Sequence, residues 1–465
     1  MQILSLDRRA GERRGRAVRD CRCRRREMLA VAVVIMAVFG PRSSGVDWPQ
    51  WRGPNRDGVW TETGVVEQFA SDPIPVKWRA AIGSGYSGPT VADGRVFVTD
   101  RVKAGAERER VHCFDATNGE TLWSHEYDCD YERVGYQAGP RAAVTVADDR
   151  AYSLGTMGHL FCFDVRSGSV LWSRDLKDEY RVKVPTWGIA AAPLIEADLL
   201  IVQAGGRDDA CLVAFDRKTG RERWRALGDS ASYSAPIIIE QAGRRVLVCI
   251  TGERVVGLNP LTGTLYWEHP FAPSRMVITI ATPVFDGRHL FVSSFYDGAL
   301  LLGVDREKPA VTRLWRRKGP SERKTDALHC CISTPVILGE HIYGVDSYGE
   351  LRCLDLKTGD RIWEDLTATP KARWSNIHMV RNGDRIWMFN ERGELLIGRL
   401  SVDGFHEISR ARLIEPTTGQ LGQRGGVCWA HPAFADGHVY ARNDEEIVCA
   451  DLSARKGIAE VDGRR

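Results

Sequence analysis

The chain has 465 residues, of which 43% are hydrophobic and 27% charged, as in ordinary globular proteins and unlike disordered or fibrous ones. Its formal net charge is +3, from 64 basic and 61 acidic residues. Ten of these arginines and four of these acids lie in residues 1–27, and setting them and Arg42 aside leaves 53 basic against 57 acidic residues, a net charge of −4. This balance excludes a basic footprint for nucleic acid, so no nucleic-acid partner is expected.

The N-terminal segment has the layout of a secretory signal. Residues 28–39 form an uninterrupted apolar run of twelve residues, with the Arg-rich leader before it and Gly40, Pro41 and the small residues 43–45 after it. A helix of twelve residues rises about 18 Å, which is too short to cross a bilayer. We therefore expect residues 1–45 to be an export signal and the mature chain to lie in the periplasm or cell envelope without a transmembrane domain. An uncleaved membrane anchor is the alternative.

One pattern recurs through the rest of the chain and ends each time in a tryptophan. The clearest copies read VHCFDATNGETLW at 111–123 and LRCLDLKTGDRIW at 351–363. The recurring tryptophans are spaced 43 to 52 residues apart and are Trp123, Trp172, Trp224, Trp267, Trp315 and Trp363. This period is typical of the blades of a β-propeller, and the fixed slot predicts that the indoles pack between blades. Trp48, Trp51 and Trp60 lie outside the slot and are expected to cover the outer seam or a face of the ring.

Each unit predicts four short β-strands. A small residue and Pro open the first strand, as at 192–193, and a turn such as Asp93-Gly94 leads to a second strand with alternating apolar residues. The third strand carries the Phe/Leu-Asp element, and a turn containing Gly leads to the tryptophan strand. Asp and Thr in that turn bond local backbone groups and Gly accepts a positive φ, so these polar residues are interpreted as structural.

Counting the units predicts an eight-bladed ring. The copies begin near Tyr86, Ala138, Gly188, Tyr233, Ile278, Cys331, Trp374 and Val427. The seventh copy lacks the Asp-x-x-Thr-Gly turn, and the eighth ends at 448–452 without a tryptophan strand, whereas residues 76–80 (VKWRA) match one. We predict an all-β fold: an eight-bladed β-propeller of four-stranded antiparallel blades over residues 46–453, closed by this N-terminal strand completing the last blade. Residues 454–465 are predicted to be a disordered tail.

Four cysteines share one slot of the repeat. They are Cys113, Cys162, Cys353 and Cys449, where other copies have Ala214, Gly257 and Gly303. Equivalent slots of different blades face different inter-blade layers, so we expect small buried thiols and no disulfides there.

The repeats resemble the pyrroloquinoline-quinone-like (PQQ-like) propeller family, whose repeat has the form Ala-x-Asp-x-x-Thr-Gly-x-x-x-Trp. Residues 114–123, 215–224 and 354–363 carry the match, and the resemblance spans about residues 47–453. The opening DWPQWRGPNRDG at 47–58 is similar to the start of many exported PQQ-like propellers. The family includes calcium-dependent quinoprotein alcohol dehydrogenases and non-enzymatic propellers such as BamB of outer-membrane assembly, so the resemblance implies the fold and leaves the activity open.

The dehydrogenase branch of the family suggests candidates for cofactor chemistry. Some of its members hold a vicinal disulfide against the PQQ plane, and Cys330-Cys331 is the counterpart in type, although in a later blade; two packed thiols are the favoured interpretation. Asn376, Asp326 and Glu391 have the residue types that ligate Ca²⁺, but solvated loop side chains are favoured because no surrounding motif matches. No haem attachment sequence is present.

A second set of candidates lies just ahead of the predicted inner strands, where pseudo-symmetry brings residues to one central mouth. We expect this mouth to bind a protein segment or a small polar ligand. The candidates are Tyr86, Ser87, Arg141, Trp187, Tyr233, Thr279, His329, Cys330, Cys331, Asn376, His378, Trp429 and His431. Side chains that merely plug the channel are the alternative. A metal site from His329, His378 and His431 lacks any spacing signature, so no metal is predicted.

These observations predict an exported, monomeric, non-catalytic binding or assembly scaffold of the bacterial cell envelope, without a cofactor and with no catalytic residue assigned. A lipid anchor is not expected, because no cysteine lies between Cys23 and Cys113. The alternative is a quinoprotein dehydrogenase that oxidises alcohols or sugars with PQQ and Ca²⁺.

Overall fold

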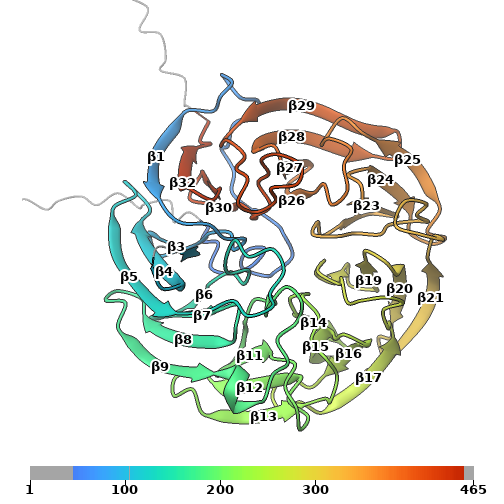
Figure 1. Ribbon diagram of the computed structural model, residues 1–465. Helices are drawn as coiled ribbons and strands as arrows, with labels where there is room; N and C mark the ends of the chain where they lie inside the picture. Colours follow the sequence, from blue (N-terminus) through green and yellow to red (C-terminus); the bar gives the residue numbers. More distant parts are fainter. Residues whose placement is uncertain (1–45, 104, 455–465) are drawn as a thin grey trace, which may run out of the picture. The chain divides into compact units, whose positions relative to one another are not determined.

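The computed structural model describes residues 46–103 and 105–454, which form eight four-stranded antiparallel sheets arranged as blades around a central channel (Figure 1). The prediction of an all-β, eight-bladed propeller is confirmed. The predicted signal at 1–45 and the tail beyond residue 454 lie outside the described residues. Within 46–103 and 105–454 no helix has the length and apolar character needed to cross a bilayer.

The strands of each blade run in order from the channel to the rim (Figure 1). The innermost strands are β2 (Thr90–Ala92), β6 (Thr145–Ala147), β10 (Leu194–Glu196), β14 (Ile237–Gln241), β18 (Val284–Phe285), β22 (Val336–Leu338), β26 (Ile377–Asn382) and β30 (Ala433–Ala435). The second strands are β3 (Arg95–Val102), β7 (Arg150–Leu154), β11 (Leu199–Gln203), β15 (Arg244–Ile250), β19 (His289–Ser294), β23 (His341–Val345), β27 (Arg385–Asn390) and β31 (His438–Arg442).

The outer half of each blade holds the repeat motif. The third strands are β4 (Arg108–Asp115), β8 (His159–Asp164), β12 (Leu212–Asp216), β16 (Arg254–Leu258), β20 (Gly298–Val304), β24 (Leu351–Asp355), β28 (Glu394–Ser401) and β32 (Glu446–Asp451). The rim strands are β5 (Thr121–Asp128), β9 (Val170–Asp175), β13 (Glu222–Ala226), β17 (Leu265–Pro270), β21 (Val311–Arg317), β25 (Arg361–Asp365), β29 (Gly404–Arg412) and β1 (Val76–Ala81). One helical turn, α1 (Leu176–Glu179), follows β9.

The first and last strands close the ring. β1 pairs with β32 in antiparallel register, with Trp78 opposite Cys449, and the eighth sheet has the order β1-β32-β31-β30. The blue β1 lies against the red β32 in Figure 1. Closure by the N-terminal strand is therefore confirmed, and it leaves the eighth blade with the same four strands as the others.

Five of the eight seams between blades are built from a tryptophan and a glycine turn. The indole N–H of Trp78 donates to the Ala116 carbonyl at 2.9 Å, and a Cβ on Gly119, whose φ is +76°, would lie 2.5 Å from the same ring. Glycine is needed twice here, for the left-handed backbone and for the close approach. The same contact recurs with Gly168 on Trp123, Gly220 on Trp172, Gly263 on Trp224 and Gly359 on Trp315. The predicted inter-blade packing of the repeated tryptophans is confirmed.

The small-residue slot lies directly opposite the tryptophan on the neighbouring strand. Cys113 pairs with Trp123, and a Cβ on Gly257 would lie 2.1 Å from the Trp267 ring, which explains why the slot takes small side chains. In the fifth blade, however, the residue opposite Trp315 is Leu301 and not the predicted Gly303, because Trp315 lies ten positions after Asp305, two more than Trp123 lies after Asp115. All ten cysteines between 113 and 449 are buried and free, among them the four of the slot and the Cys330-Cys331 pair.

The seam between the seventh and eighth blades departs from this pattern. Ser409 occupies the tryptophan position of β29, opposite Ile397. Its hydroxyl accepts a hydrogen bond from the Phe69 N–H at 2.9 Å, and the Phe69 ring lies 6.1 Å from that of Trp387. Residues ahead of β1 thus fill the place of the missing indole.

Candidate functional site

The segment that precedes β1 closes one end of the central channel. The N–H and carbonyl of Trp48 both bond to Val91 of β2 at 2.9 Å, and the Val146 N–H of β6 donates to the Pro49 carbonyl at 2.8 Å. Further along, the Trp60 N–H donates to the Arg381 carbonyl of β26 at 2.8 Å. Residues 47–60, called the plug segment below, are therefore fastened to the inner strands of the first, second and seventh blades.

Trp48 and Trp60 of the plug segment are fully buried beside the inner strands. The Trp60 ring lies 5.0 Å from Phe434 of β30 and 5.4 Å from Trp387, and the Trp48 ring lies 6.0 Å from Phe434. Of the two expected places, the outer seam and a face of the ring, the outer seam is wrong, because the plug segment runs along inner strands at one end of the channel.

Trp51 stands at the centre of the channel. Its ring packs against Ala143, Ala192 and Ala235, and its indole N–H donates to the Thr282 hydroxyl at 2.8 Å. Its ring also meets that of His431 edge-on at 4.6 Å between centroids. These neighbours lie just ahead of the inner strands of five different blades, and their mostly small side chains leave a space of the width of one indole.

Arg56 of the plug segment is buried without an acidic partner. Its guanidinium donates to the carbonyls of Ala192 at 3.2 Å, Pro236 at 3.1 Å and Pro193, and to the Gln50 side chain at 2.8 Å. Burial lowers its pKa to about 9. The arginine supplies hydrogen bonds to carbonyls of two blades that face the channel and have no strand beyond them.

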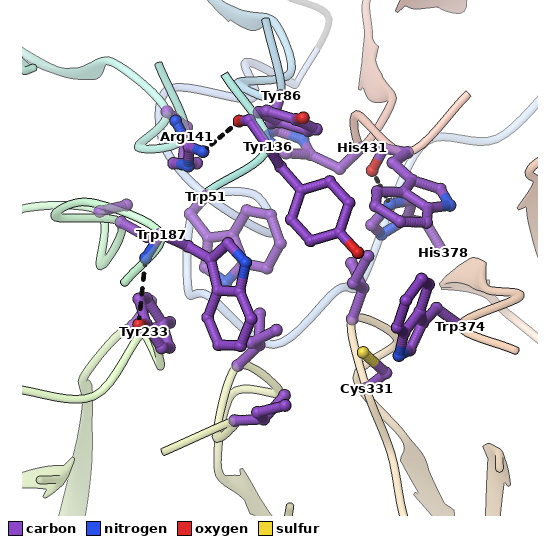
Figure 2. Close-up of a pocket in the computed structure, with 18 of the residues that line it drawn as sticks. Trp51, Tyr86, Tyr136, Arg141, Trp187, Tyr233, Cys331, Trp374, His378 and His431 are labelled. Carbon is purple, nitrogen blue, oxygen red and sulfur yellow. Dashed lines mark hydrogen bonds between the residues drawn. The ribbon is translucent and has the colours of Figure 1, made fainter. Parts of the chain in front are cut away.

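Above Trp51 the channel widens into a cavity of about 340 Å³ (Figure 2), called the mouth cavity below. Its aromatic lining is Trp51, Tyr86, Tyr136, Trp187, Tyr233, Tyr296, Trp374 and Trp429. The remaining lining side chains include Arg141, Arg373, Met276, Ile278, Ile280, Cys331, Ile332, His378 and His431. Among the described residues that line it, none is Asp or Glu.

The structure brings eight of the predicted site residues to the mouth cavity. They are Tyr86, Arg141, Trp187, Tyr233, Cys331, His378, Trp429 and His431. The others are buried behind its wall, namely Ser87, Thr279, His329, Cys330 and Asn376. Ile278 and Ile280 line the cavity while Thr279 between them does not, since neighbouring side chains of an extended segment point to opposite sides.

Sequence reasoning missed several residues of the cavity wall. Tyr136, Tyr296 and Arg373 lie in loops whose lengths differ between blades, so the repeat carries no signal for them. Trp374 and Trp51 were visible as a unit start and as part of the 47–58 motif. The sequence does not show that either side chain points into the channel, because this depends on how the closed ring places its segment.

Tyr136 extends across the mouth cavity, in front of the other side chains in Figure 2. Its ring centroid lies 6.5 Å from Trp187, 6.0 Å from Trp374 and 6.2 Å from Trp429, residues of three different inter-blade loops. Arg141 holds this loop by donating to the Gly135 carbonyl at 2.9 Å and to the Tyr136 carbonyl. Arg141 is thus committed to shaping the wall.

The groups of the cavity that resemble catalytic side chains are held in unreactive forms. Burial raises the pKa of Cys331 to about 12, so its thiol is protonated at neutral pH. Burial lowers the pKa of His378 to about 4 and that of His431 to about 3, so both imidazoles are neutral. The Nε2–H of His378 donates to the Trp429 carbonyl at 2.8 Å.

The candidate metal ligands do not converge. His329 is bonded elsewhere, since its Nε2 accepts from the Gly319 N–H at 3.0 Å. Arg424 holds both oxygens of Glu391 at 3.0 and 2.9 Å, and Arg317 holds both oxygens of Asp326 at 2.8 and 3.0 Å. Within the described residues no group of three or more His, Cys, Asp or Glu side chains is placed to hold a metal ion. The residues proposed for Ca²⁺ therefore do not fit a calcium site, which needs six to eight converging oxygens.

Fold and site together define a PQQ-like propeller with an aromatic cavity at one end of its channel. The sequence matches the PQQ-like family model described as outer membrane protein assembly factor BamB over residues 107–365 and 330–459, more than half its length, and the chain belongs to this family. No curated protein matches the sequence significantly.

Solved structures share the fold at low identity. BamB from Moraxella catarrhalis is 15% identical with a TM-score of 0.52, over 80% of this chain and 98% of that one. Quinohemoprotein alcohol dehydrogenase ADHIIG from Pseudomonas putida HK5 is 12% identical with a TM-score of 0.60, over 90% and 82%. The quinohemoprotein alcohol dehydrogenase from Comamonas testosteroni is 12% identical with a TM-score of 0.60, over 88% and 81%. At these identities the likeness concerns the fold.

Proposed function

We propose that the protein is an exported, non-catalytic binding scaffold of the bacterial cell envelope, and that its mouth cavity holds a segment of a partner protein. The observation that carries this proposal is the wall of the cavity. Seven aromatic side chains from separate loops surround a space of about 340 Å³ whose floor is the chain's own Trp51. Concave sites lined by Trp, Tyr and Arg are where protein interfaces concentrate their binding energy.

The chemistry of the cavity supports binding over catalysis. A general base or nucleophile works best with a pKa near the working pH. The pKa of the Cys331 thiol lies far above neutrality and those of the two imidazoles far below it, so the thiol stays protonated and the imidazoles are weak bases. The indole N–H of Trp429 donates to the Glu391 carboxylate at 3.3 Å, and Arg424 donates to the same carboxylate at 2.9 Å, so this candidate base is already paired.

Export and envelope location rest on the N-terminal pattern and on the family. An apolar run of twelve residues after an Arg-rich leader is typical of export signals, and the family description names an outer-membrane assembly factor. Expression of the full chain with a C-terminal tag and fractionation of the cells tests this point. We expect a shortened protein in the periplasmic or envelope fraction, and full-length protein in the cytoplasm contradicts it.

The alternative, a PQQ- and Ca²⁺-dependent dehydrogenase, is favoured by one feature, the flat aromatic walls that suit a planar ring. Purified protein titrated with PQQ and CaCl₂ separates the two functions. We expect no stoichiometric quinone absorbance on the protein and no dye reduction with ethanol or glucose. Tight stoichiometric PQQ binding overturns the scaffold proposal.

A further inference from the structure

The charged groups at the mouth cavity are all of one sign. Arg141 and Arg373 line it, and the Arg275 guanidinium lies 5.3 Å from the centre of the Tyr296 ring, which is part of its wall. The closest carboxylates are already paired, Glu391 with Arg424 and Glu322 with Arg373 at 3.3 Å. An occupant of the cavity therefore meets guanidinium groups and no free acid among the described residues.

Arg373 and Arg275 keep hydrogen-bonding capacity for a ligand. One terminal nitrogen of Arg373 is shared between the Tyr296 hydroxyl and Glu322, both at 3.3 Å, while its buried Nε has no partner among the described residues. Arg275 has no carboxylate within 4.0 Å in the same part of the chain, and its side chain is exposed. Arg141, by contrast, donates hydrogen bonds to the carbonyls of its own loop.

The guanidinium groups of Arg275 and Arg373 flank the same residue, Tyr296, on the side of the fourth to seventh blades. Arg275 stacks on its ring, and Arg373 bonds its hydroxyl and lies 4.5 Å from the ring centre of Trp374. Behind this cationic rim the wall is apolar, with Met276, Ile278 and Ile280. The cavity thus pairs an apolar pocket closed at its floor with a cationic edge on one side.

We infer, building on the proposed function, that the occupant is a short acidic peptide segment of the partner, which inserts one aromatic side chain into the mouth cavity and pairs its carboxylates with Arg275 and Arg373. A pocket closed by Trp51 admits a side chain and not a passing strand. Aromatic side chains bury large areas against indole and phenol walls, and carboxylates are the groups that guanidinium forks bind best.

The electrostatics of the wall agree with this occupant. The arginines that act on Tyr136 are Arg373 and Arg424, and the same two arginines act on Cys331. Both arginines favour the anionic form of these groups and so lower their pKa values, against the larger opposite effect of burial. On this side of the cavity the wall therefore lies close to two arginines, whose positive charge attracts an acidic segment.

Fluorescence anisotropy with labelled pentapeptides tests the inference on the purified mature protein. The probes are Gly-Asp-Phe-Asp-Gly, the neutral Gly-Asn-Phe-Asn-Gly, the basic Gly-Lys-Phe-Lys-Gly and the ring-free Gly-Asp-Ala-Asp-Gly. We expect the acidic aromatic peptide to bind about tenfold tighter than the neutral one, with the basic and ring-free peptides weaker still. Added NaCl should reduce the difference in affinity between the acidic and the neutral aromatic peptide, because salt screens the charges.

Variants locate the contacts. The double variant Arg275→Gln/Arg373→Gln should remove the preference, so that the acidic and the neutral aromatic peptide bind with equal affinity. Arg323→Gln, whose side chain bonds Tyr348 outside the cavity lining, is the matched control and should keep the preference.

Equal affinities of the four peptides, tighter binding of the basic peptide, or no binding of any peptide at millimolar concentration overturns the inference. Phenylacetate binding as tightly as the acidic peptide also overturns it, because the occupant is then a small molecule. The first three results leave the proposed function standing, whereas tight phenylacetate binding also removes its partner segment. The PQQ titration and the localisation test the scaffold role separately.

Discussion

The two ends of the central channel are both built from aromatic and arginine side chains, but one end is filled and the other encloses a cavity. At the plug end, Trp51 fills the space between three alanines, and Arg56 supplies donors to channel carbonyls. At the mouth end, aromatic rings of similar size surround a cavity of about 340 Å³. The ring of blades therefore tolerates a filled and an unfilled channel, and the aromatic groups at the mouth are not required to close it. This contrast makes the plug a stability element and the mouth a binding element.

The largest expected effect is the removal of a plug indole. Trp60→Ala deletes a side chain buried between Trp387 and Phe434 and should lower the free energy of unfolding by about 3–5 kcal/mol. Urea unfolding followed by circular dichroism measures it. The matched change at the mouth, Trp374→Ala, removes a half-buried ring and should cost about 1 kcal/mol or less. Equal losses at the two positions contradict the division between the ends.

The buried arginine of the plug comes next. Arg56→Met keeps the volume of the side chain but leaves channel carbonyls of two blades without donors, so we expect a loss of about 1–3 kcal/mol in the free energy of unfolding. Arg166→Met, at an exposed turn, should stay within about 0.5 kcal/mol of the parent. A neutral Arg56→Met variant shows that water replaces the guanidinium.

Acid should weaken the junction of plug and mouth, where the two buried histidines lie. Their folded pKa values, about 4 for His378 and about 3 for His431, are below the ordinary 6.5. The unfolded chain therefore binds protons first as the pH falls through 6.5, and each imidazole removes about 1.4 kcal/mol of stability per pH unit until its folded pKa is reached. His378→Gln, which retains a donor for the Trp429 carbonyl, should lessen the loss between pH 6.5 and 5.5 by about that amount. Urea unfolding at both pH values measures the difference, and an unchanged pH dependence is the contrary result.

The smallest effect on stability is expected at Tyr136. Tyr136→Ala removes the ring that extends across the mouth cavity and should change the free energy of unfolding by about 0.5 kcal/mol or less, because the ring is half-exposed. It should also raise acrylamide quenching of tryptophan fluorescence, since Trp187, Trp374 and Trp429 lose their cover. Tyr348→Ala, outside the cavity lining, is the control.

The repeat allowed the blades, their number and the closing strand to be predicted, because each depends on local residues. The turn from Asp115 to Gly119 and the indole of Trp78 specify one seam, and the same two elements specify the next. Where the repeat varies, the prediction fails, as with Gly303, which does not lie opposite Trp315 because that tryptophan comes two positions later than in the first blade. The candidate site was half predicted, because positions ahead of inner strands are countable, whereas alternation sends Thr279 and Cys330 away from the cavity that their neighbours line.

By itself the sequence determined the architecture of this protein, since short-range patterns of turn glycine, small slot residue and tryptophan repeat with the period of a blade. The tertiary structure alone decided the site. Trp51, Tyr136 and Arg373 come from positions far apart in the chain, and they meet only when the ring closes and the segment ahead of β1 enters the channel. Local propensity acts over a few residues, whereas a cavity is a property of surfaces brought together from all eight blades.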